Sequence, residues 1–193
     1  MILNQNNIDN FTQIKKTVSM GKANVFSFVI MGPAVIILFI LYAYNWKTIF
    51  YLSMSDCIIF ILGAILLAIS HEFIHGFVFH FFCIEKWKSI KFGILTEYLT
   101  IYCHCKEAIT LSQYRIGTMM PLIFTGIIPY IIALHFGNFI LMLLSLLMIL
   151  GAGGDVIIIL LCIREKGKTL VIDDEKECGC TLYMAKDIKE EQS

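Results

Sequence analysis

Charged side chains are scarce in this chain of 193 residues, because lysine, arginine, aspartate and glutamate together make up only 16% of it. Soluble globular domains carry about 25% of such residues. Disordered segments combine low hydrophobicity with high net charge, whereas 58% of this chain is hydrophobic. The composition therefore excludes both an ordinary soluble domain and an intrinsically disordered protein.

Neither sign of charge is in excess, and proline is rare. The 15 basic and 15 acidic residues give a formal net charge of zero. A protein that binds nucleic acid usually shows a basic excess, so no nucleic-acid partner is expected. The three prolines exclude a proline-rich linker protein, and the length predicts one domain.

Long apolar runs are the main feature that is present. A helix of about 20 residues crosses a hydrocarbon core of about 30 Å. Backbone groups in lipid must be satisfied within their own segment, so each run should be a helix. The sequence predicts an all-α membrane protein with four transmembrane helices. They lie at about 25–44, 57–83, 116–136 and 139–163.

The basic residues fall almost entirely on one side of the predicted membrane. Of the 15 lysines and arginines, only Lys47 lies outside the side shared by the two termini and the central loop. Cytoplasmic loops carry the excess of lysine and arginine, so we expect a multi-pass cell-membrane protein with both termini cytoplasmic. Tyr44, Trp46 and Tyr51 lie near the outer boundary, a level that aromatic side chains prefer.

This orientation divides the chain into three parts. They are a cytoplasmic N-terminal segment (1–24), a four-helix transmembrane domain (25–165) and a cytoplasmic tail (166–193). The N-terminal segment is polar and does not resemble a cleavable signal, so the first span should be retained. The tail is polar from Asp173 onward, and we expect it to be solvated and partly mobile.

The loop between the second and third spans has a different character. Residues 90–105 (IKFGILTEYLTIYCHC) are rich in β-branched and aromatic side chains, which predicts one or two short strands. The edge of such a strand could pair with an extended substrate. A hairpin that only packs on the cytoplasmic face is an equal alternative.

Ionisable residues within the second run mark a candidate functional site, because such groups are costly at membrane depth. The run contains His71-Glu72-Phe73-Ile74-His75. Residues four apart share one helix face, so both imidazoles can bind one metal ion while Glu72 lies beside it. This His-Glu-x-x-His pattern supplies two zinc ligands and a carboxylate base. The alternative is a pair of core histidines with a hydrogen-bonded glutamate.

A hydrolytic zinc site needs a third protein ligand, and Asp155 is the best candidate. The histidine pair and Asp155 each lie about 16 residues from the outer start of their spans, or about 24 Å down at 1.5 Å per residue. The glycines at 151, 153 and 154 would let this helix approach a neighbour closely or loosen locally. The alternative is a glycine-rich packing seam in which the aspartate caps a broken helix.

The other histidines fit the site less well. His80 is nine residues after His71 and faces the opposite side of the helix, and His135 lies near the outer face. His104 lies in the central loop and could fold back as a ligand in place of Asp155.

The cytoplasmic cysteines form two Cys-x-Cys pairs, at 103–105 and 178–180. They should be reduced thiols, since the cytoplasm is reducing. Structural zinc sites usually separate such cysteines by two to four residues, so the signal for a second zinc is weak. Cys57, Cys83 and Cys162 lie in or beside the spans and are expected to fill apolar space.

These motifs together resemble the putative zincin peptidase family, bacterial membrane proteins long catalogued as a domain of unknown function. The resemblance covers roughly residues 55–175. It rests on His71-Glu72-x-x-His75-Gly76, Tyr102-Cys103-x-Cys105 with Glu107, Pro121, and Gly154-Asp155.

The chain is also similar to the site-2 proteases, intramembrane zinc metalloproteases in which two histidines and one aspartate bind zinc. Carried over, the resemblance implies that His71, His75 and Asp155 hold Zn²⁺ and that Glu72 is the catalytic base. Those proteases place the aspartate in an Asn-Pro-Asp-Gly or Leu-Asp-Gly context, whereas here it stands in Gly-Gly-Asp-Val.

The function implied is a zinc-dependent intramembrane or membrane-bound endopeptidase that hydrolyses peptide bonds of membrane proteins with a zinc-activated water. The expected partners are a membrane protein or peptide substrate and the lipid bilayer. The alternative is a non-catalytic metal-binding membrane protein that regulates or chaperones another membrane protein. Glu72 argues against it, because a structural metal site needs no base. A metal transporter would need polar groups along a whole path, which the outer halves of the spans lack.

Overall fold

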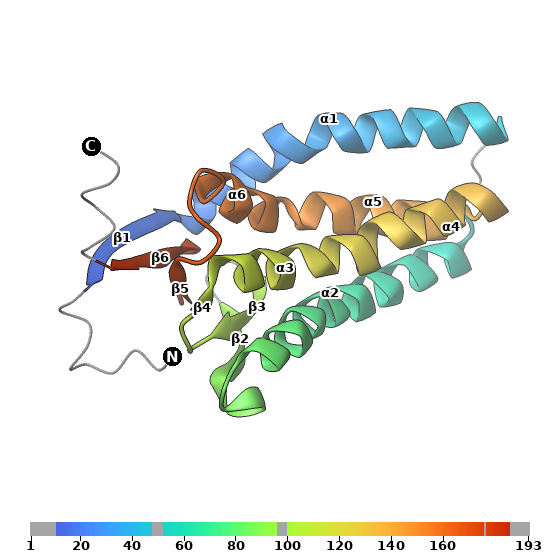
Figure 1. Cartoon of the computed structure of the whole chain (residues 1–193). Helices are drawn as coiled ribbons and strands as arrows, with labels where there is room; N and C mark the ends of the chain where they lie inside the picture. The colour runs from blue at the N-terminus through green and yellow to red at the C-terminus, as the bar shows by residue number, and fades with distance from the viewer. Residues whose placement is uncertain (1–10, 48–51, 96–99, 176, 186–193) are drawn as a thin grey trace.

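The computed structural model describes residues 11–47, 52–95, 100–175 and 177–185. It confirms four helical spans that are long and apolar enough to cross a membrane. They are Met20–Trp46, Met54–Phe82, Leu111–Phe136 and Phe139–Leu161. In Figure 1 the spans run side by side, and the strands gather at one end of the helical bundle.

The first two spans are single helices with defined ends. Helix α1 (Met20–Trp46) ends where Lys47 turns into the left-handed region, at φ 44°. Helix α2 (Met54–Phe82) begins with a capping box, in which the Ser53 side chain accepts from the Asp56 amide and the Asp56 carboxylate accepts from the Ser53 amide. Tyr51, which the sequence places near the outer membrane boundary, lies outside the described residues.

The third span is interrupted. Helix α3 (Leu111–Pro121) passes into the π-helical segment η3 (Leu122–Ile127), which continues as α4 (Ile128–Phe136). A proline lacks the amide that an α-helical hydrogen bond needs, and Pro121 stands at the start of the irregular segment. Such π-helical turns occur frequently at functional sites.

The fourth span is also broken, at the glycine run that was expected to let the helix loosen locally or approach a neighbour. Helix α5 (Phe139–Gly151) stops at Ala152, and α6 (Gly153–Leu161) continues from there. A Cβ atom on Gly153 would lie 2.4 Å from Cβ of Ser27. The missing side chain therefore lets α6 approach α1 closely at the turn that precedes Asp155.

Replacing Gly153 with alanine should destabilise the protein by about 1–3 kcal/mol, because the new methyl group overlaps Ser27. Gly151 in the same span has open space where a Cβ would stand, so Gly151→Ala is the matched control and should change stability little. Thermal unfolding in detergent measures both variants. Equal melting temperatures would contradict the close approach of α1 and α6.

Two small sheets add to the predicted helices, so the all-α prediction is incomplete. The two-stranded sheet pairs β2 with β3 and confirms the strands predicted at 90–105; the four-stranded sheet has the order β1-β6-β5-β4. The strands are β1 (Phe11–Val18), β2 (Ile90–Leu95), β3 (Thr100–Cys105), β4 (Ile109–Thr110), β5 (Leu170–Asp173) and β6 (Cys178–Ala185).

The tail is ordered where a mobile end was expected. Strand β6 pairs along its whole length with β1, from Phe11 opposite Ala185 to Val18 opposite Cys178. The expectation of a solvated, mobile tail is wrong for this strand, because Cys180 and Leu182 are fully buried in the core below the sheet. Strands β1 and β6 thus cover the end of the bundle that carries the candidate site.

The packing leaves α1 and α2 on the outside of the bundle. Helix α1 packs on α5 and α6, while α2 packs on α3 and α5. One buried cluster, which includes Tyr42 and Met142, fills the half of the bundle away from the sheets. A second, which includes Phe79 and Leu182, joins the helices to the four-stranded sheet. The candidate site lies near this second cluster.

Candidate metal centre

The two histidines of the motif point to the same side of α2. Their ring centroids are 5.0 Å apart, and the rings are nearly perpendicular. Glu72 lies between them in sequence, and one ligand atom from each of the three side chains falls within 4.8 Å of the others. The helix therefore places His71, Glu72 and His75 in one group, as their spacing predicts.

Asp155 joins this group from α6, 84 residues along the chain. Its Oδ2 lies 3.1 Å from Nε2 of His71, and its Oδ1 lies 3.3 Å from Nε2 of His75. Each carboxylate oxygen thus faces one imidazole nitrogen. The structure brings together the three side chains that the sequence analysis selected as ligands.

Hydrogen bonds on the far side of each ring fix the histidine tautomers. Nδ1 of His75 lies 3.0 Å from the carbonyl oxygen of Gly117, which can only accept, so this nitrogen carries the proton. The Thr125 hydroxyl donates to the Pro121 carbonyl at 2.8 Å. Its oxygen is therefore an acceptor for Nδ1 of His71, 3.4 Å away. In their neutral forms, both histidines then present a bare Nε2 to Asp155.

This arrangement fits a divalent metal ion. Each neutral imidazole directs its Nε2 lone pair at one oxygen of Asp155, and acceptors that face one another need a metal ion or a proton between them. Zinc is commonly held by two histidines and one carboxylate, with a further position open for water or substrate. A hydrogen bond from the second ring nitrogen to a carbonyl or hydroxyl is the usual way in which a ligating histidine is oriented.

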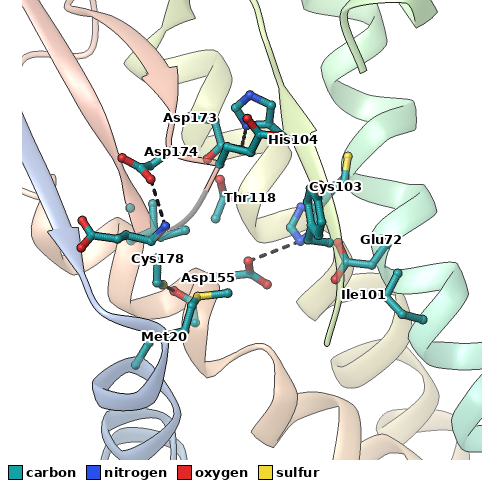
Figure 2. A pocket seen from close by; sticks show the side chains of 18 of the residues that line it. Met20, Glu72, Ile101, Cys103, His104, Thr118, Asp155, Asp173, Asp174 and Cys178 are labelled. Carbon is teal, nitrogen blue, oxygen red and sulfur yellow. Dashed lines mark hydrogen bonds and ion pairs between the residues drawn. The ribbon is translucent and has the colours of Figure 1, made fainter. Parts of the chain in front are cut away.

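Glu72 stands beside the convergence point, next to β3. Figure 2 shows its carboxylate close to the side chains of Ile101 and Cys103, on the side of the cavity away from Asp155. Asp155, and not Glu72, faces both Nε2 atoms at hydrogen-bonding distance. A carboxylate in this position is available for proton transfer.

A cavity of about 190 Å³ connects this group to the sheets. Its walls come from α1, α2, β3, α3, α6 and the β5–β6 connection, and include Asn24, Ser27, Tyr102, Thr118 and Asp173. The walls nearest the sheets carry acidic groups, so water can be stabilised along this approach (Figure 2). The site therefore opens toward the end of the bundle that carries the sheets.

His104 lines this cavity without joining the metal group. Its Nδ1 lies 3.2 Å from Oδ2 of Asp173, and the Tyr114 hydroxyl donates to Oδ1 of the same carboxylate at 2.6 Å. Tyr114 and Asp173 also form part of the cavity wall, which was not predicted. No sequence signal joins them, because they lie 59 residues apart and Asp173 belongs to a segment that reads as tail.

The other two histidines lie elsewhere, as predicted. The ring of His80 stacks on Trp87 with centroids 4.7 Å apart. His135 is in the last turn of α4, at the opposite end of the bundle. Neither contributes to the group formed by His71, Glu72 and His75.

The cysteines do not form a second metal site among the residues that the structure describes, where the motif on α2 supplies the one candidate cluster. The Cys-x-Cys pairs are split. Cys105 lies 3.3 Å from Cys83, and Cys180 lies 3.5 Å from Cys162. Burial raises the pKa of the Cys178 thiol to about 12, so this thiol stays protonated near neutral pH.

Comparison with known proteins finds one family whose model matches the chain. Residues 64–171 match the model of a family described as "Putative zincin peptidase", and this stretch is more than half of the chain. It contains His71, Glu72, His75 and Asp155. No curated protein and no solved structure matches the chain.

Proposed function

Because the chain belongs to the putative zincin peptidase family, we propose that it is a zinc-dependent, membrane-embedded endopeptidase. In this proposal His71, His75 and Asp155 hold the zinc ion, and Glu72 is the catalytic base. The substrates are peptide bonds of other membrane proteins.

One observation carries the proposal. The Nε2 atoms of His71 and His75 face the two oxygens of one buried carboxylate, 3.1 and 3.3 Å away, and a glutamate stands next to them. A structural metal site does not require that glutamate, whereas peptide hydrolysis requires a base close to the metal. The arrangement therefore favours an enzyme over a metal-binding regulator or chaperone.

The protein groups divide the chemistry among them. A bound zinc ion supplies Lewis acidity, which lowers the pKa of water toward about 7 and polarises a peptide carbonyl. Glu72 takes one proton from the attacking water and delivers it to the leaving amine, so that water and a peptide bond become a carboxyl group and an amine. Gly117 and Thr125 keep the two imidazoles in the tautomer that this chemistry requires.

Strand β3 is suited to position an extended substrate. In the described part of the chain it pairs with β2 alone, and four of its residues, Ile101 to His104, line the cavity. Its second edge can offer main-chain hydrogen bonds to a peptide laid beside Glu72. A membrane-spanning substrate would expose its backbone for such pairing after local unwinding.

The experiment that tests this function is a hydrolysis assay on the protein reconstituted in lipid vesicles. Fluorescently labelled casein and a detergent-solubilised membrane fraction serve as probes. We expect cleavage that a zinc chelator stops and that added zinc restores. Cleavage that is insensitive to the chelator, or none with either probe in a zinc-loaded sample, would contradict the proposal.

The orientation in the membrane is a separate prediction. Lys47 and Lys106 are exposed and lie at opposite ends of the bundle. In a Cys57→Ser background, we expect an impermeant maleimide to label Lys47→Cys in intact cells. It should label Lys106→Cys only after the membrane is permeabilised, because the basic end is expected to be cytoplasmic. The reverse pattern of labelling would show that the orientation is wrong.

A further inference from the structure

The chain folds back against α2 just after that helix ends. The turn η2 (Lys86–Ser89) places the Trp87 ring 6.0 Å from the ring of Phe73 and 4.7 Å from that of His80, measured between centroids. Phe73 stands between the two histidines of the metal centre. The Trp87 ring is also 6.4 Å from that of Phe77, so it lies between the levels of Phe73 and His80, about one helical turn (about 5 Å) past the metal centre, on the outward face of α2.

The turn has the composition of a membrane-interface anchor. Trp87 is 43% exposed, and Phe73 beneath it is 52% exposed. Lys86 and Lys88 flank the tryptophan and are both exposed. Tryptophan prefers the headgroup level of a bilayer, because its body is apolar and its N–H needs a polar partner. The adjacent lysines can reach lipid phosphate groups.

Counting helical residues from the opposite end of the bundle also places the metal centre near the boundary of the hydrocarbon core. There, the Trp46 indole donates to the Leu134 carbonyl at 2.8 Å, so the ends of α1 and α4 lie together. Gly137 also lies against the Trp46 ring. A hydrocarbon core of about 30 Å corresponds to about 20 residues of helix. Counting back about 20 residues from Gly137 reaches Gly117, whose carbonyl oxygen faces His75.

The second span agrees with this count. Its capping box at Ser53 and Asp56 contains polar groups that belong at the outer boundary. About 20 residues after Asp56 the helix reaches Gly76, which directly follows His75. The two spans that hold and orient His75 thus both place it about one hydrocarbon thickness from the outer boundary.

From these two independent observations, we propose that the Lys86–Ser89 turn binds the phospholipid headgroup layer and holds the metal centre at the inner boundary of the hydrocarbon core. The partner is the bilayer surface itself. The lysines contact lipid phosphates, and Trp87 with Phe73 occupies the boundary between headgroups and acyl chains. The acidic wall of the cavity then faces water.

This depth defines the substrate class more narrowly, a step that rests on the proposed function. Peptide bonds that reach the site are those where a membrane span ends and its juxtamembrane segment begins. Backbone there is close to water and can become extended at a lower cost than in the middle of a span. The site would therefore cut at the cytoplasmic ends of spans rather than at the bilayer midplane.

The depth can be measured because the chain contains two tryptophans. Trp46→Phe leaves Trp87 as the single reporter in phosphatidylcholine vesicles. A matched deep reference is Leu66→Trp in a chain that also carries Trp46→Phe and Trp87→Phe. Leu66 is 65% exposed on α2, about 15 Å below Asp56. Lipids brominated near the headgroup or near the chain ends quench each reporter according to its depth.

We expect Trp87 to be quenched more strongly by the shallow bromines and the Leu66→Trp reporter by the deep ones. Stronger quenching of Trp87 by the deep bromines would overturn the proposal. The measurement needs no hydrolysis, so it separates the two proposals. An inactive protein with a shallow Trp87 would contradict only the proposed function, and an active protein with a deep Trp87 would contradict only the anchor.

Discussion

Glu72→Gln is expected to lower the hydrolysis rate by about 10²–10⁴-fold while the protein keeps its zinc. The amide has nearly the same shape as the carboxylate but cannot take a proton from water. His71, His75 and Asp155, which form the converging set, are unchanged in this variant. Initial rates of casein cleavage and the zinc content of the same sample measure the two quantities.

A matched control for this variant is Glu85→Gln, which changes an exposed glutamate just after α2. It should keep both activity and zinc. A Glu72→Gln protein that keeps full activity would contradict the role of Glu72 as base. A variant that loses zinc along with activity would show that Glu72 is a ligand.

Asp155→Ala is expected to weaken zinc binding by at least about 100-fold. Loss of an outer-sphere partner already costs about 10–100-fold in metal affinity, and Asp155 supplies the only negative charge that faces both Nε2 atoms at hydrogen-bonding distance in the described chain. Equilibrium dialysis against buffered zinc measures the affinity. Activity should fall in parallel, because among the described residues Asp155 is the carboxylate that faces both Nε2 atoms at hydrogen-bonding distance.

The control for this variant is Asp56→Asn, at the opposite end of α2, which should keep zinc although it weakens the helix cap. Asp155→Asn, which preserves the side-chain volume, distinguishes loss of the ligand from loss of the fold. Zinc affinity unchanged in both Asp155 variants, with normal melting temperatures, would remove Asp155 from the site and point to His104.

The spans and the ligand-bearing faces could be predicted from the sequence. Runs of about 20 apolar residues have few alternatives to membrane helices, and a separation of four residues on a helix places His71 and His75 together. The partnership with Asp155 followed from equal depth in two spans. This reasoning succeeds because the fixed rise per residue of a helix converts a distance in sequence into a depth in the membrane.

The pairing of β1 with β6 could not be predicted. Strand β1 pairs with β6 across most of the chain length, with Phe11 opposite Ala185. Its sequence, FTQIKKTV, carries polar side chains that read as a solvated segment. Pairing between strands so distant in sequence leaves no local signal, so the cavity wall at Asp173 was missed with it. The π-helical segment that presents Thr125 to His71 was also missed, although Pro121 at its start is a local signal of an interrupted helix.

The central claim is that two histidines and one aspartate hold a single zinc ion. Zinc X-ray absorption on the wild-type protein, purified without chelators, tests it most directly. We predict about one zinc per chain, with nitrogen and oxygen neighbours at about 2.0–2.2 Å and no sulfur neighbour. A sulfur shell at about 2.3 Å would assign the metal to the cysteines, and a zinc-free protein would contradict the metal centre altogether.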